Sequence, residues 1–176
     1  MKGIQRTFKL KDDKIAEPED YLGAKLAKMM MSDGSNFWSM SSEKYVKAAV
    51  ANVEEKLAKS KKRFPSRCNI FLKPIYRPEM DDSCELKADG IQYYQELVGV
   101  LRWMVELGRV DILLNTSLMS AHLALPRLGH LKQLIHIFGY LKAHPKRKLA
   151  FDAAHPNIYE RRYKRYDWYN FYRGAK

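Results

Sequence analysis

Two pairs of adjacent aspartates are the residues whose type and spacing best suit metal-dependent chemistry in this sequence. Asp81-Asp82 follows Glu79-Met80, and Asp12-Asp13 follows Leu10-Lys11. Phosphoryl transfer by two metal ions needs carboxylates that hold the ions a few ångströms apart, as at the tip of a hairpin between apolar strands. Both pairs here lie among proline or charged residues instead. We therefore interpret all four side chains as solvated surface carboxylates.

The histidines and cysteines carry no recognisable catalytic or metal-binding pattern. No two histidines stand four residues apart, and the two cysteines show neither metal-ligand spacing nor a disulfide framework. The sequence also has no glycine-rich phosphate loop and no Gly-x-Ser-x-Gly nucleophile motif. We therefore predict no catalytic residue, no metal site and no cofactor in this chain. The residues concerned are His122, His130, His136, His144, His155, Cys68 and Cys84.

The charge is large and unevenly distributed. The 176 residues carry a formal net charge of +12. Residues 41–80 and 121–176 are strongly basic, whereas residues 81–120 are acidic. Such separation steers a polyanion toward the basic surfaces, and nucleic acid is the commonest candidate. An acidic membrane face, an acidic protein and an ordinary solvated surface are the alternatives.

Two basic clusters are the candidate binding residues. The first lies at the end of a predicted helix, where the cations either contact phosphates or complement the helix dipole. The second is interleaved with tyrosine, tryptophan and phenylalanine, which either stack on bases or pack against helices. The first cluster comprises Lys56, Lys59, Lys61, Lys62, Arg63 and Arg67, and the second Arg161, Arg162, Lys164 and Arg165.

Short strands and one amphipathic helix are predicted for the first third of the chain. Strands are expected at residues 4–10, 21–27 and 37–40, with a turn at 33–36, as a small antiparallel meander. A helix is expected over residues 42–59, capped by Ser41 or Ser42. Its apolar stripe is Val46, Val50, Val53 and Leu57.

A long irregular connection, residues 64–88, separates this helix from three more and is the candidate hinge. Asp89 is expected to cap the first of the three, which ends at Gly108, and Asp111 is expected to cap the next, which ends at Pro126. Short connections imply antiparallel neighbours, and a short strand follows at 149–151. The predicted stripes are Ile91, Tyr94, Val98, Leu101 and Val105; Leu114, Leu118, Ala121 and Leu125; and Leu128, Leu131, Ile135 and Phe138.

The predicted fold class is therefore α+β. It comprises a small N-terminal antiparallel sheet, one helix, a long loop, and an antiparallel three-helix unit with a short strand. No run of about 18 apolar residues could span a bilayer, and the start lacks the apolar stretch of a secretory signal. We expect a soluble, intracellular, cytoplasmic chain that has no membrane partner. The predicted segments are residues 1–40, 41–63, 64–88, 89–152 and 153–176.

Five motifs in order resemble the reverse transcriptase of copia-type LTR retrotransposons, a class of transposable element. The run from Tyr93 to Trp103 is similar to the family's Tyr-x-x-Leu-Val-Gly-x-Leu-x-Tyr, and Arg109 to Ile112 is similar to its Arg-Pro-Asp-Ile. Residues 131–142, ending in Tyr-Leu-Lys, resemble a third motif. Tyr21-Leu22-Gly23 and residues 40–45 resemble the Tyr-Phe-Leu-Gly element and the Ile-Ser-Gln-x-x-Tyr helix entry. Residues 166–172 resemble diatom and algal copia-like elements.

The resemblance implies a polyprotein fragment that lies between two active sites. Tyr21, Leu22 and Gly23 would belong to the primer grip, residues 41–63 to a thumb-like helix, and residues 89–152 to the connection. The parent would be an RNA-directed DNA polymerase that uses magnesium and carries ribonuclease H, acting in the cytoplasm, in a virus-like particle or in the nucleus. Its palm and ribonuclease H portions, outside this chain, would be partners.

This fragment would lack the catalytic aspartates and retain only nucleic-acid binding to primer and template. The alternatives are a helical protein-interaction module and a retroelement remnant without function.

Overall fold

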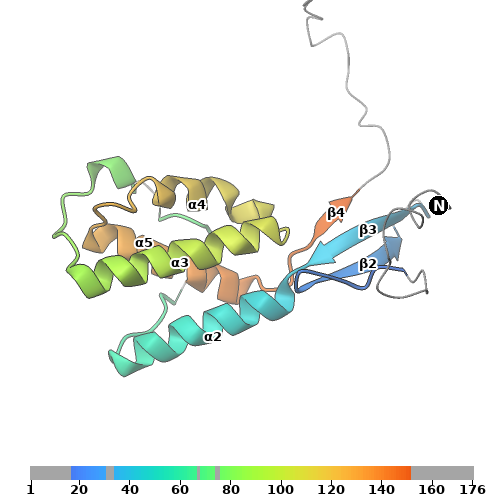
Figure 1. Ribbon diagram of the computed structural model, residues 1–176, viewed down its shortest axis with the longest axis horizontal. Helices are drawn as coiled ribbons and strands as arrows, with labels where there is room; N and C mark the ends of the chain where they lie inside the picture. The colour runs from blue at the N-terminus through green and yellow to red at the C-terminus, as the bar shows by residue number, and fades with distance from the viewer. Residues whose placement is uncertain (1–16, 31–33, 67, 74–75, 152–176) are drawn as a thin grey trace, which may run out of the picture.

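The computed structural model describes residues 17–30, 34–66, 68–73 and 76–151, in an α+β arrangement (Figure 1). A four-stranded antiparallel sheet lies at one end, and a unit of packed helices lies at the other. Two 3₁₀ turns, Pro78–Met80 and Val110–Ile112, interrupt the connections. The strands, in sheet order, are β1 (Asp20–Tyr21), β2 (Ala24–Met30), β3 (Asn36–Ser41) and β4 (Leu149–Phe151). The helices are α2 (Glu43–Lys59), α3 (Ala88–Glu106), α4 (Leu113–Ser120) and α5 (Leu128–Ala143).

A tight turn breaks the strand predicted over residues 21–27. Leu22 and Gly23 have φ angles of 51° and 92°, and the flanking Tyr21 pairs with Ala24. Two consecutive positive φ angles are typical of the two-residue hairpin loop that matches strand twist. The primer-grip-like motif is thus a hairpin tip with two exposed apolar side chains. The predicted strand at residues 4–10 lies outside the described residues.

The short strand predicted at residues 149–151 forms, and it completes the N-terminal sheet. β4 pairs antiparallel with β3, from Trp38 opposite Phe151 to Met40 opposite Leu149. Sequence patterning predicts a strand but does not identify its partner, because any edge with free backbone groups can accept it. The two ends of the described chain therefore meet in one sheet.

The helices α2 and α3 bury the stripes that their periodicity predicts. Val46, Val53 and Leu57 of α2 are buried, as are Tyr94 and Leu101 of α3. The N-cap of α2 is Ser42, although its side chain makes no capping hydrogen bond. The predicted C-terminal glycine of α3 is confirmed, since Gly108 has a φ of 94°.

The predicted cap of α3 is wrong by two residues. The helix begins at Ala88 with Lys87 at its N-cap, so Asp89 lies inside the first turn. An acidic residue there still complements the helix dipole, which explains why the sequence suggests a helix start at this position.

The helix α4 presents its predicted apolar stripe to solvent. Leu114, Leu118 and Leu125 are 69%, 39% and 54% exposed, while Thr116 and Met119 face the core. The helix also ends at Ser120, before the predicted boundary at Pro126. The 3₁₀ turn that precedes α4 has about three residues per turn. It therefore changes which side of α4 faces the core.

The helix α5 anchors the connection expected to be a hinge. His136 Nε2 donates a hydrogen bond to the Ile70 carbonyl at 3.0 Å, and His130 Nε2 donates one to the Pro78 carbonyl at 2.9 Å. Gln133 Nε2 donates to a third carbonyl of the connection, at 3.2 Å. Its described residues are therefore held against α5, and the polar side chains of α5 are satisfied there.

Asp81 is not the free surface carboxylate that its sequence context suggests. Its carboxylate accepts hydrogen bonds from Tyr76 Oη at 2.7 Å and from the Ser83 amide at 3.0 Å. Burial alone would raise the pKa of Asp81, but the hydrogen bonds from Ser83 and Tyr76 outweigh it and lower the pKa. A Cβ atom added to Gly129 would overlap Asp81 Oδ2, so a side chain at this position must displace the carboxylate.

Gly129→Ala is therefore expected to lower the free energy of unfolding by about 1–3 kcal/mol, because the displaced carboxylate loses its hydrogen bonds. Gly99→Ala is the matched control, since a Cβ there meets nothing within 4 Å. That control is expected to stabilise α3 by about 0.5–1 kcal/mol. Urea unfolding measures both, and equal effects of the two variants would contradict the assigned role of Asp81.

A buried ion pair holds the turn between α3 and α4, next to the sheet. Arg109 is 1% exposed, and its Nε and Nη2 both donate to the carboxylate of Asp111 at 2.9 Å. Tyr140 Oη donates to the same carboxylate at 3.2 Å. Asp111 therefore does not cap α4 as predicted. A Cβ at the adjacent Gly108 would lie 3.0 Å from Met40 Cε, so the sheet packs directly on this turn.

Asp111→Asn is expected to reduce stability by about 3 kcal/mol at neutral pH, because it leaves a buried guanidinium uncompensated. Burial would raise the pKa of Asp111, but Arg109 outweighs it and lowers the pKa. A lowered pKa contributes stability above the ordinary Asp pKa of about 3.9 and loses it as pH falls through the folded-state value. The stability difference between wild type and variant should thus be constant at neutral pH and shrink in acid. Chemical unfolding across this range measures it, and a difference that grows in acid would refute the assignment.

Within the ranges described above, no helix is both long enough and apolar enough to cross a lipid bilayer.

Candidate nucleic-acid interface

A basic cleft lies where the sheet meets the start of α2. Its volume is about 590 Å³, and four lysines line it together with hydroxyl groups of β3. Only Ser42 separates β3 from α2, so the backbone fixes the helix start against the sheet. The lysines come from β2, from α2 and from the approach to β4, and they are Lys25, Lys44, Lys47 and Lys148.

Two carboxylates in this cleft only partly balance the lysines. Glu43 forms an ion pair with Lys47 at 2.7 Å, and the hydrogen bond from Lys47 lowers the pKa of Glu43. Asp20 is the other acidic group of the lining. Four cations against two anions leave the cleft positive, and clefts of one sign concentrate ligands of the opposite sign.

The second basic region follows the C-terminus of α2. The Lys62 amide donates to the Leu57 carbonyl at 2.9 Å, and the Lys61 amide donates to the Ala58 carbonyl at 2.9 Å. This is a Schellman motif, which usually places glycine in the left-handed position. Here Lys61 occupies that position, with a φ of 54°. The motif turns the chain sharply, so that consecutive cations project from one helix end.

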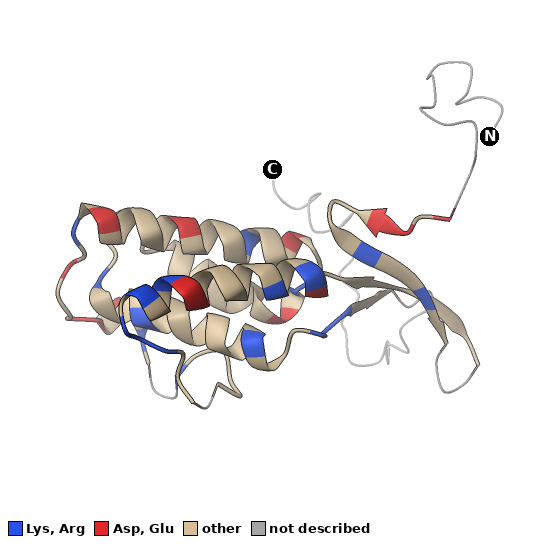
Figure 2. Ribbon diagram, turned by 90° about the horizontal axis from the view of Figure 1, so that it is seen from below, with Lys and Arg blue, Asp and Glu red and all other residues tan. Residues whose placement is uncertain are grey.

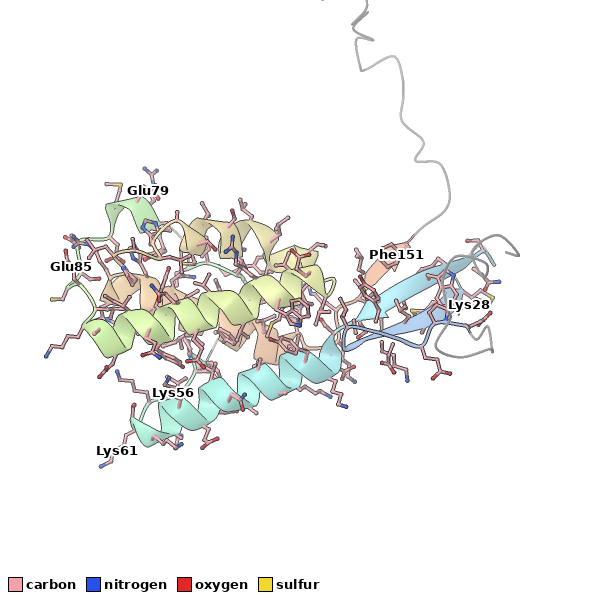
Figure 3. All side chains as sticks on the ribbon, viewed as in Figure 1. Lys28, Lys56, Lys61, Glu79, Glu85 and Phe151 are labelled. Atoms are coloured by element: carbon pink, nitrogen blue, oxygen red, sulfur yellow. The ribbon has the colours of Figure 1, made fainter. Side chains whose placement is uncertain are left out.

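Some cations of this region form ion pairs with neighbouring carboxylates, and others do not. Lys59 pairs with Glu55 at 2.9 Å, and Lys56 pairs with Glu96 at 3.7 Å. Lys56 Nζ also lies 3.5 Å from the centroid of the Tyr93 ring. In the described part of the chain, Lys61, Lys62 and Arg63 have no ion-pair partner. These three side chains are therefore available to an anionic ligand, and Figure 3 shows Lys61 at the end of α2.

Lys62 and Arg63 line a second cleft of about 610 Å³. Lys142 of α5 lies in the same cleft, although it pairs with Glu54 at 2.5 Å. Basic groups therefore lie at both ends of α2 (Figure 2). Between them, the solvent face of α2 carries the exposed Ala48, Ala51 and Ala58, along with Glu55. Small side chains let a ligand backbone approach the helix closely.

The structure brings together only part of the predicted site. Gly23 lines the first cleft, while the neighbouring Tyr21 and Leu22 are exposed at the hairpin tip. Lys61, Lys62 and Arg63 follow the last turn of α2, which carries Lys56 and Lys59. The other five predicted cations lie outside the described residues, and they are Arg67, Arg161, Arg162, Lys164 and Arg165.

Sequence reasoning missed the cations of the first cleft. Lys44 and Lys47 stand three residues apart on the polar face of a predicted helix, a signal that could have found them. Lys25 and Lys148 carried no such signal, because their positions depend on how the strands pair. Lys142 was missed for the same reason, since it approaches Lys62 only when α5 packs on α2.

The part of the chain that the structure describes contains no candidate metal site. Among its residues, no group of three or more histidine, cysteine or acidic side chains is placed to hold a metal ion. Asp81 is occupied by Tyr76 and Ser83, and its neighbour Asp82 is exposed.

Comparison with protein-family models, curated proteins and solved structures found no match for this chain.

Lys61→Gly is expected to raise the free energy of unfolding by about 1 kcal/mol, because glycine adopts the left-handed conformation without the Cβ penalty. Lys61→Ala is the control, since it removes the same charge but keeps the strained backbone. Both variants should weaken nucleic-acid binding equally. Thermal unfolding and binding titrations separate the two effects. Equal stability of the two variants would disprove the conformational explanation.

Proposed function

We propose that this chain binds a nucleic-acid duplex along α2 and the adjoining sheet, without polymerase activity of its own. It would be the primer-grip, thumb and connection segment of a copia-type retrotransposon reverse transcriptase. Such a role places it inside the cell, in the cytoplasm, the nucleus or the particle of the parent element. Its partners would be a primer and template, with palm and ribonuclease H portions supplied by the rest of the parent polyprotein.

The observation that carries this proposal is the pair of basic regions joined by one exposed helix face. The 17 residues of α2 extend for about 25 Å, compared with about 34 Å for one turn of B-form DNA. A duplex lying along α2 could therefore place one stretch of phosphates at the first basic region and a second stretch at the other. The alanines between them leave room for the groove edge. Contacts to the phosphate backbone bind a duplex without reading its sequence. This is expected for part of an enzyme that copies any template.

The order of the elements also supports the proposal. A hairpin that carries Tyr21-Leu22-Gly23 leads through β3 into a basic helix, as the resemblance implies for a primer grip followed by a thumb. The helices α3, α4 and α5 then correspond to the expected connection. The interaction-module alternative draws its support from a different surface, the exposed apolar side of α4.

Lys44→Gln/Lys47→Gln is expected to weaken binding to a 20-base-pair RNA–DNA hybrid by roughly 10- to 100-fold at 0.1 M salt. If both lysines contact phosphates, the slope of log K against log salt, measured on a B-form DNA duplex of the same length, should become less steep by about 1.8. Fluorescence anisotropy over a salt series measures both quantities.

The matched control is Arg77→Gln/Lys87→Gln, which removes the same charge from exposed residues away from the basic cleft. It should lower affinity only slightly and leave the salt slope unchanged. Affinity that is independent of salt, or equal losses in the two variants, would contradict the proposed interface. Primer extension by the purified chain would contradict the absence of polymerase activity.

A further inference from the structure

The segment that contains α4 is rich in exposed apolar side chains and free of formal charge. Residues 112–126 contain no lysine, arginine, aspartate or glutamate, in a chain with 52 such residues. Half of the large hydrophobic side chains that are exposed in the described residues lie between residues 103 and 128. They are Trp103, Val110, Leu113, Leu114, Leu118, Leu125 and Leu128. A concentration of this kind marks an interaction surface.

Two of these side chains form a ridge along α4. Leu114 and Leu118 stand four residues apart on this helix, and residues four apart lie on the same side of an α-helix, one above the other. Their exposed fractions are 69% and 39%, so the ridge has no cover within the described chain. Val110, in the 3₁₀ turn before α4, is 51% exposed.

A cleft of about 210 Å³ runs beside α4, between it and α3. Thr116 lines the cleft and is only 3% exposed, and its hydroxyl has no hydrogen-bond partner among the described residues. A buried hydroxyl without a partner is costly, which indicates that a further group can supply one there. The cleft is thus a second, independent sign that this side receives a partner.

The only charges that line the cleft are of opposite sign. Arg102 and Glu106 stand one turn apart on α3, and neither has an ion-pair partner in the described part of the chain. A two-fold axis between them would place Arg102 of one copy against Glu106 of the other, twice. The cleft is therefore complementary to itself.

We propose that this side of the molecule is the contact surface for a second copy of the same chain. The two copies meet around a two-fold axis, with the α4 ridges packed together and the Arg102–Glu106 pairs at the rim. The net charge of +12 opposes contact of two copies through their basic regions, so two copies would meet where the chain carries little charge, and the Arg102–Glu106 pairs supply the complementarity for a second copy. The charge-free segment avoids that repulsion.

This inference does not rest on the proposed function. The helices α2 and α4 lie on opposite sides of α3 and α5, so a duplex on α2 and a second copy on α4 do not compete (Figure 1). We expect a weak association, with a dissociation constant on the order of 10–100 μM.

Sedimentation velocity of the nuclease-treated full chain, from about 2 to about 200 μM, tests the association. Wild type should convert from monomer to dimer, and Leu114→Asp should weaken the dimer at least tenfold. Met80→Asp is the matched control, because Met80 and Leu114 are both 69% exposed, and it should change nothing. A chain that stays monomeric throughout, or a dimer that Leu114→Asp leaves intact, overturns the proposal.

The charge pairs give a second test that is specific for two-fold symmetry. Arg102→Glu and Glu106→Arg should each weaken self-association, because each dimer would then contain two like-charge pairs. An equimolar mixture of the two variants should associate again, since every pair in the mixed dimer has opposite signs. A mixture that associates no better than either variant alone overturns the proposed pairing. Loss of nucleic-acid binding by the Lys44/Lys47 variant would leave these results unchanged, so the two proposals fail separately.

Discussion

A positive charge buried at the junction of helices and sheet constrains the whole arrangement. A guanidinium as enclosed as that of Arg109 is tolerated only beside a carboxylate that replaces its lost hydration. Asp111 provides it from two residues away, so the backbone must turn sharply between them. Tyr140 binds the same carboxylate and brings in α5, while the preceding Gly108 lies against Met40 of β3. The ion pair thus fixes the turn between α3 and α4, and the sheet packs on this turn at Gly108.

The electrostatic character of the molecule follows from that arrangement. With the sheet fixed, the chain passes from β3 straight into α2, and the connection from α5 to β4 returns beside it. Lys25 of β2, Lys47 of α2 and Lys148 before β4 then share one cleft despite being far apart in sequence. Each lysine repels the others, and folding tolerates this only because core burial elsewhere is larger. Repulsion among these lysines lowers the stability of the fold. The cleft is therefore better explained by binding of an anionic ligand than by a contribution to stability.

Local patterns predicted the elements well and their surroundings poorly. The stripes of α2 and α3 were predicted correctly because an amphipathic helix of four or five turns has one side that must be buried. The stripe with Leu114 and Leu118 was equally regular but is exposed to solvent. Periodicity shows which side of a helix is apolar, but not whether that side faces the core. Asp111 was misassigned as a cap because its partner, Arg109, gave no sign of being buried. Lys148 entered the site only through strand pairing between distant segments, which no local pattern encodes.

The pairing of β3 with β4 also determines the order in which the molecule can assemble. Trp38 and Phe151 are opposite each other across more than a hundred intervening residues, most of them in the helices. Closing so long a loop is slow unless the intervening chain has already compacted. During synthesis, β1, β2 and β3 can form from neighbouring residues, but the free edge of β3 stays open until the helical unit has folded and delivered the last strand. The edge that completes the basic cleft is therefore also the site most open to mispairing in a nascent chain.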